Sequence, residues 1–138
     1  GSDSHASVDA AEELRLLEST QRLVQRQRNV LADEARPEVA EALWQAAVAG
    51  GAQAAARPFA GLAVGQQADF VVLGDALLEG LSPVQQLSTP VFASHRRATV
   101  REVWVSGQRR VQNGRHAGAD VAAERFVAAR RRLLSELG

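Results

Sequence analysis

The chain of 138 residues contains no cysteine, no methionine and no lysine. Without cysteine it has no disulfide, no thiolate catalyst and no Cys-ligated zinc site. All sixteen positive charges are arginines, which excludes Schiff-base chemistry and the lysine of a phosphate-binding loop. Because methionine is absent, we expect the chain to be a piece of a longer protein.

Sixteen acidic residues balance the sixteen arginines, so the formal net charge is zero. No overall field attracts nucleic acid or an anionic membrane, and we expect neither as a partner. Neither an apolar run of about 18 residues nor a basic-then-apolar leader is present, which argues against a membrane span and a secretory signal. Together with the lack of cysteine, this predicts a cytoplasmic protein.

Two helices are predicted in the first part of the chain. Asp9, followed three residues later by Glu12, resembles a capping box, so a helix should begin near residue 9. Its apolar residues recur as pairs seven positions apart, at 16–17, 23–24 and 30–31, which predicts one packed face along a single helix. Pro37 suits the first turn of a second helix, which Gly50-Gly51 should loosen.

The later part of the chain predicts strands. Residues 68–73 favour a buried strand, and Ser82-Pro83 marks a turn or helix start. Residues 90–93 favour a short edge strand because they begin with proline. Residues 100–105 and 108–112 predict a hairpin across Ser106-Gly107, with a second turn at Asn113-Gly114. Residues 119–137 return to helical spacing and predict a C-terminal amphipathic helix.

Asp3, in the sequence Ser2-Asp3-Ser4, is the strongest candidate for chemistry. A carboxylate in a loop ahead of a helix can ligate a metal and accept a proton from bound water. From the local pattern alone, a structural cap or turn role is favoured by about two to one, since Asp and Ser dominate such positions. Ser2 and Ser4 flank Asp3 in the sequence, and we expect their hydroxyl groups to orient its carboxylate.

Other candidates are weaker. His5 forms Asp-x-His with Asp3, but a catalytic zinc needs about three protein ligands, and this segment supplies no further pair. His95 and His116 fall in Arg-rich turn regions and receive no role. The arginine runs at 96–97 and 130–132 are typical of solvated faces rather than of an anion site.

Segments along nearly the whole chain resemble one enzyme family. The order Gly-Ser-Asp-Ser at 1–4, Glu-Glu-Leu-Arg at 12–15, and residues 21–23 and 28–29 are similar to formimidoylglutamate deiminases of the amidohydrolase superfamily. Residues 50–52, 61–65 and 68–73 resemble the passage by which such enzymes leave their barrel and rejoin a small β-sandwich. Residues 103–107 and 113–114 resemble the closing hairpin of that sandwich. Many hydrolases and deaminases of the superfamily share these later segments. The earlier segments are the ones that indicate formimidoylglutamate deiminases among them.

The resemblance implies an α/β fold: the C-terminal part of a metal-dependent (β/α)8 TIM barrel, with helices and part of a small β-sandwich. Residues 1–58 would hold the end of the last barrel strand and its helices, 59–116 the sandwich portion, and 117–138 the C-terminal helix. Asp3 matches the family's aspartate at the end of the eighth strand, which ligates the metal and shuttles protons.

The activity implied is metal-dependent hydrolytic deimination of N-formimino-L-glutamate to N-formyl-L-glutamate and ammonia, a step of histidine degradation. The resemblance implies one divalent metal, zinc, a small-molecule substrate, the remainder of the barrel as a partner, and a homodimer. The other metal ligands and the substrate-binding residues would belong to earlier strands, so this segment alone would be inactive. Two alternatives stay open: the tail of another amidohydrolase, such as a nucleobase deaminase or chlorohydrolase, or a non-catalytic interaction module.

Overall fold

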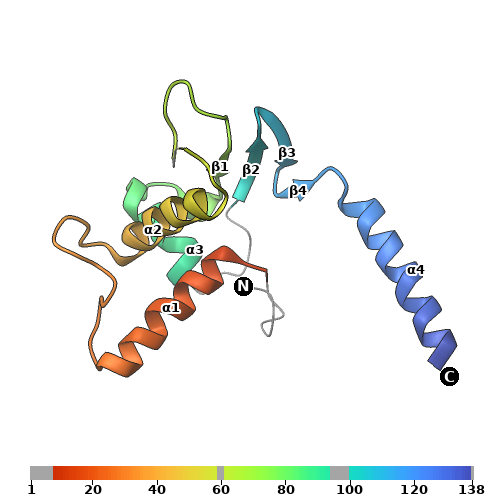
Figure 1. Cartoon of the computed structure of the whole chain (residues 1–138), viewed down its shortest axis with the longest axis horizontal. Coiled ribbons are helices and arrows are strands. Elements are labelled where there is room, and N and C mark those ends of the chain that lie inside the picture. Colours follow the sequence, from red (N-terminus) through yellow and green to blue (C-terminus); the bar gives the residue numbers. More distant parts are fainter. Residues whose placement is uncertain (1–7, 59–60, 94–99, 138) are drawn as a thin grey trace. The chain divides into compact units, whose positions relative to one another are not determined.

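The computed structural model describes residues 8–58, 61–93 and 100–137 (Figure 1). Within these ranges the chain divides into two compact units. Residues 8–58, 61–66 and 74–93 form a helical unit, and residues 67–73 and 100–137 form a unit with an antiparallel sheet and a long helix. Helices combined with a sheet agree with the predicted α/β class.

The helix expected near residue 9 is α1, Ala10–Gln25. Asp9 is its N-cap: one carboxylate oxygen accepts hydrogen bonds from the backbone N–H groups of Ala11 at 2.9 Å and Glu12 at 3.3 Å. These bonds satisfy two of the donors that a helix leaves unpaired at its start. The predicted start of the first helix is therefore confirmed.

The end of α1 differs from the prediction, because the helix does not continue through Val30 and Leu31. It ends at Gln25, and Arg26 adopts a left-handed backbone conformation with φ of 54°. Beyond this point the chain turns so that the N–H groups of Val30 and Leu31 reach the carboxylate of Glu18. Leu31 still packs against the core, but from the returning chain rather than from the helix.

The second predicted helix is confirmed as α2, Val39–Ala54, which begins two residues after Pro37. Gly50 and Gly51 lie inside it rather than loosening its end. The last turn stays closed because the N–H of Ala55 donates to the carbonyl of Gly51 at 3.0 Å. Glycine lowers helix propensity by about 1 kcal/mol without forbidding the helical conformation.

Helix α3, Pro83–Phe92, confirms a helix start at Ser82-Pro83 and corrects the strand expected at residues 90–93. Ser82 and Gln85 form a reciprocal capping box, with bonds of 3.4 Å and 2.9 Å. Pro90 lies inside the helix near its C-terminal end. Because the N-terminus is strongly capped and Val91 is fully buried, helix formation outweighs the one hydrogen bond that Pro90 cannot donate.

The core of the helical unit lies where α3 packs against α1 and α2 (Figure 1). Its buried apolar residues are Leu14, Val39, Ala40, Leu43 and Val91. Trp44 packs against their edge, and its indole Nε1 donates to the carbonyl of Leu87 at 3.1 Å. That bond ties α2 to α3. A short 3-10 helix, η1 (Ala76–Leu78), adds the buried Leu78.

The second unit contains a four-stranded antiparallel sheet in the order β1-β2-β3-β4. Its strands are β1 (Phe70–Leu73), β2 (Val100–Val105), β3 (Gln108–Gln112) and β4 (Arg115–His116). The turns at Ser106-Gly107 and Asn113-Gly114 both have positive φ at their two central residues, as a tight hairpin requires. Both predicted turns are confirmed. The strand expected at 68–73 is present but not buried, since Val71 is exposed.

Side chains of neighbouring strands stack on one face of this sheet. Phe70 of β1 lies opposite Trp104 of β2, and their rings are stacked with centroids 5.6 Å apart. The guanidinium of Arg109, from β3, lies 5.7 Å from the Trp104 ring. The C-terminal helix predicted over residues 119–137 is confirmed as α4, Ala119–Leu137, and none of its residues is buried.

Candidate functional site

The predicted site residues Asp3, Ser2 and Ser4 lie outside the residues that the structure describes, as does His5. Their roles therefore stay predictions. The first helix described after them is α1, which begins at Ala10.

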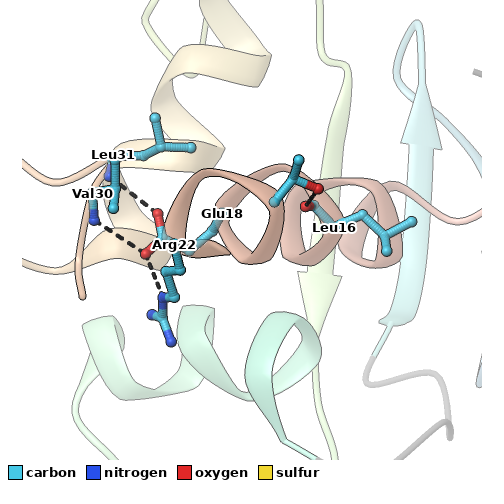
Figure 2. Close-up of polar contacts among 6 residues, drawn as sticks. Leu16, Glu18, Arg22, Val30 and Leu31 are labelled. Atoms are coloured by element: carbon cyan, nitrogen blue, oxygen red, sulfur yellow. Dashed lines mark hydrogen bonds and ion pairs between the residues drawn. The ribbon is translucent and has the colours of Figure 1, made fainter. Parts of the chain in front are cut away.

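The most constrained polar group in the described chain is the carboxylate of Glu18, on α1 (Figure 2). Its side chain is 0% exposed. Oε1 accepts from Arg22 Nε at 2.6 Å and from the Val30 N–H at 3.2 Å, and Oε2 accepts from the Leu31 N–H at 3.1 Å. A buried carboxylate is tolerated only when it is paired in this way.

This arrangement gives Glu18 a structural role. All of its described donors come from the chain itself, and they join the middle of α1 to the loop that follows it. The bonds hold that loop in a reversed course, and the loop carries Leu31 back onto the core. Glu18 thereby fixes the C-terminal half of the helix that follows the predicted catalytic segment.

An exposed ion pair closes the loop between α1 and α2. Arg36 Nη2 lies 2.7 Å from Asp33 Oδ2, and the Arg36 backbone N–H donates to Asp33 Oδ1 at 2.8 Å. The side-chain hydrogen bond from Arg36, followed by the backbone one, lowers the pKa of Asp33 below its ordinary value of 3.8. The same pair raises the pKa of Arg36. Asp33 and Arg36 thus stabilise the loop between α1 and α2.

No group of three or more His, Asp or Glu side chains that could hold a metal occurs within residues 8–58, 61–93 and 100–137. His116, which received no role from the sequence, is exposed, and its Nδ1 accepts a hydrogen bond from the Gly118 N–H at 3.0 Å. His95 and Arg96-Arg97 lie outside the described ranges. Residues 130–132 are exposed on α4, as predicted for a solvated face.

Sequence reasoning missed Glu18, although a signal was available. Glu18 follows Leu14 by four residues and precedes Arg22 by four, so it lies on the core face of the helix with an arginine one turn away. The stack of Phe70, Trp104 and Arg109 was missed as well, because it depends on strand register.

None of the described helices is both long enough and apolar enough to cross a membrane. In comparisons with known proteins, no family model matches the chain. The chain is 45% identical over 129 residues to "Formimidoylglutamate deiminase" of Pseudomonas aeruginosa, an alignment that covers 92% of this chain and 28% of that protein.

Among solved structures, the chain is similar to an amidohydrolase from Brucella melitensis, with a TM-score of 0.87 and 42% sequence identity. That match covers 97% of this chain and 29% of the solved chain. The chain thus spans less than a third of the length of either relative. Both matches agree with the resemblance found in the sequence: over nearly its whole length, the chain corresponds to part of an amidohydrolase similar to formimidoylglutamate deiminase.

Proposed function

We propose that the whole protein containing this chain is a metal-dependent formimidoylglutamate deiminase. The observation that carries the proposal is the 45% identity to a protein of that name over 92% of the chain. The similarity to a solved amidohydrolase supports the same reaction class. The reaction adds water to N-formimino-L-glutamate and releases N-formyl-L-glutamate and ammonia, a C–N bond hydrolysis of histidine degradation.

Asp3 is the residue that we assign to the chemistry. Its carboxylate oxygens are suitable ligands for a divalent metal such as zinc, and the described residues add no further cluster of metal-binding groups. The family resemblance implies that the remaining ligands belong to earlier barrel strands, outside this chain. When bound, the metal would make water more acidic and more nucleophilic at neutral pH.

In this mechanism the Asp3 carboxylate takes the proton of the attacking water and passes it to the leaving nitrogen, which departs as ammonia. Ser2 and Ser4 would orient that carboxylate through hydrogen bonds. For the whole protein we propose a (β/α)8 barrel with residues 1–58 at its end, a sandwich portion at 59–116 and a closing helix at 117–138. We also propose that the whole protein is a homodimer and that it is located in the cytoplasm.

The test uses the whole protein that contains this chain. We expect it to release ammonia from N-formimino-L-glutamate but not from guanine. Release from guanine alone would favour the alternative of a nucleobase deaminase, and release from neither would favour an interaction module. The sequence ahead of Gly1 gives a second test, because this reaction class needs a His-x-His pair that this chain does not contain.

The assignment of Asp3 is tested by Asp3→Asn, which keeps the size of the side chain and removes its base. We expect turnover to fall at least about a hundredfold, the usual scale for loss of a general base. The matched control is Asp9→Asn, because asparagine also caps helices well and turnover should stay unchanged. Near-normal activity of Asp3→Asn would rule out Asp3 as the proton carrier.

A further inference from the structure

The turn between β3 and β4 consists of Asn113 and Gly114, a pair whose sequence favours spontaneous deamidation. In that reaction the main-chain nitrogen of Gly114 attacks Cγ of Asn113. A bond between that nitrogen and Cγ forms, the bond between Cγ and Nδ2 breaks, and ammonia leaves with the proton that the nitrogen loses. Because glycine has no side chain, nothing crowds the attacking nitrogen.

The product of the attack is a cyclic imide, which water opens at one of its two C–N bonds. Cleavage at Cγ gives aspartate at position 113. Cleavage at the former main-chain carbonyl of Asn113 gives isoaspartate, in which the main chain runs through Cβ and Cγ and is one carbon longer. Either product replaces a neutral amide by a carboxylate, and the second also changes the length of the turn.

The folded turn holds the two reacting groups apart. Asn113 has φ of 50° and Gly114 has φ of 73°, and the strands pair at Gln112 and Arg115, so this is a two-residue type I′ turn. In this type ψ of the first central residue is about 30°. That angle places Cβ of Asn113 and the Gly114 nitrogen on opposite sides of the bond between Cα and the carbonyl carbon. Ring closure needs them on the same side, so the turn must first change conformation.

The attacking nitrogen is also engaged in a hydrogen bond. Gly114 N–H donates to the carbonyl of Arg101, on β2, at 3.0 Å. The nitrogen attacks after it loses its proton, and donation to a carbonyl holds that proton in place. The other hairpin turn makes the same kind of contact, because Gly107 N–H donates to the carbonyl of Ala68 at 3.0 Å. The closed turn thus opposes the reaction by its geometry and by this bond.

The strand that closes the turn is short. β4 consists of two residues and pairs with β3 at two positions. One further bond follows the strand, from the N–H of Ala117 to the carbonyl of Arg110 at 3.3 Å. A short terminal strand opens more readily than the rest of a sheet, without unfolding of the whole unit. The turn at Asn113 therefore has a local route to the reactive conformation.

We propose that Asn113 is a deamidation site that the closed turn between β3 and β4 keeps unreactive and that reacts when this turn opens. Formation of isoaspartate then prevents closure, because a turn lengthened by one carbon no longer fits the two-residue register. The reaction makes a transient opening of β4 permanent. This inference does not rest on the proposed enzymatic function.

The first test compares the folded and the unfolded states of the whole protein that contains this chain. Each is incubated at mildly alkaline pH, without denaturant or unfolded in urea, and the tryptic peptide of residues 111–115 is analysed by mass spectrometry. Asn113 should deamidate at least about tenfold more slowly in the folded protein, because reaction then requires local opening. Equal rates in the two states, or no reaction in urea, would overturn the proposal.

Asn29 is the internal control, because it is the other asparagine of this chain and also has positive φ, 54°. The residue after it is Val30, whose branched side chain crowds the nitrogen that would attack. Asn29 should therefore react slowly in both states. A rate at Asn29 in urea as high as that at Asn113 would show that the reaction measured is not the one assigned to the Asn113-Gly114 pair.

Ala117→Pro tests whether β4 controls the reaction. Proline removes the N–H that bonds to Arg110, and it leaves residues 113–115 unchanged. We expect faster deamidation of Asn113 in the folded variant and an unchanged rate in urea. Unchanged amide exchange at Gly107 would show that the rest of the sheet is intact. An intact variant with no faster reaction would show that something other than the closed turn protects Asn113, and the proposal would be wrong.

A second measurement needs no variant and decides the question if Ala117→Pro disturbs the whole sheet. Urea is added at concentrations below the unfolding transition, and two rates are followed in the unsubstituted protein: deamidation of Asn113 and amide hydrogen exchange of Gly114. Both require loss of the bond from Gly114 to Arg101, so they should rise by the same factor. Exchange that rises while deamidation stays constant contradicts control of the site by this turn.

Discussion

Glu18 and Arg22 form an ion pair across one turn of α1, with Arg22 Nε 2.6 Å from Glu18 Oε1. The pair is asymmetric: Glu18 is fully buried, whereas the Arg22 side chain is 38% exposed. Arg22 also lies with its guanidinium 5.6 Å from the ring of Phe92, at the end of α3. One residue pair thus joins α1, the loop after it and α3.

Glu18→Gln should loosen the loop after α1. The amide cannot accept all three hydrogen bonds of the carboxylate, and hydrogen bonds to a charged group contribute about 1.5 to 3 kcal/mol each. Amide hydrogen exchange at Val30 and Leu31 should therefore become about tenfold to a hundredfold faster. Glu136→Gln is the matched control, since its exposed pair with Arg132 contributes little. Unchanged exchange in Glu18→Gln would contradict this role.

Trp44→Phe tests the link between α2 and α3. The substitution keeps a large apolar ring but removes the Nε1 donor, which leaves the Leu87 carbonyl without this partner. We expect a loss of about 1 kcal/mol in the free energy of unfolding, measured with urea. Leu43→Ala, in the buried core, should cost more, about 2 to 5 kcal/mol. Equal losses from both variants would show that the indole bond contributes more than an ordinary neutral hydrogen bond.

The sequence predicted the elements whose signals are local. Asp9 marked the start of α1, and Ser106-Gly107 and Asn113-Gly114 marked the turns, because capping and positive φ depend on neighbouring residues. It failed where tertiary contacts override local preference. Pro90 suggested an edge strand, but burial of the adjacent Val91 keeps the segment helical.

The candidate site could be predicted from the sequence only through the family resemblance. The local pattern around Asp3 favoured a turn residue, because a single carboxylate between two serines does not indicate where further metal ligands would lie. The ligands that would complete a metal site are not found among the described residues, so no spacing within them could reveal it. Glu18 was missed for a different reason: its donors, Val30 and Leu31, become neighbours only after the chain reverses.

The pKa of Asp33 gives a prediction about pH. Because hydrogen bonds from Arg36 lower that pKa below 3.8, the contact stabilises the fold above the unfolded value. Its contribution is lost as the pH falls through the lower, folded pKa. An NMR titration of the Asp33 carboxyl should show a midpoint below 3.8. Arg36→Ala should move the midpoint upward, whereas Arg28→Ala should not, and equal shifts would refute the specific role of Arg36.

The exposed leucines of α1 predict that the 138-residue chain self-associates when it is produced alone. Leu16 and Leu23 lie seven residues apart on one side of the helix, and Leu23 is 80% exposed. Val30 follows Leu23 by seven residues but does not share its exposure, because it is partly buried in the loop that Glu18 holds. Light scattering should detect assemblies larger than a dimer.

Replacing Leu16 and Leu23 with glutamine should reduce that scattering, because the substitutions remove a continuous apolar stripe from the helix surface. Val64→Gln is the control: Val64 is fully exposed but lies in a loop, apart from such a stripe, and its loss should change little. If the unsubstituted chain remains monomeric, the α1 leucines are not an adhesive surface. The same conclusion follows if Val64→Gln lowers scattering as much as the double variant does.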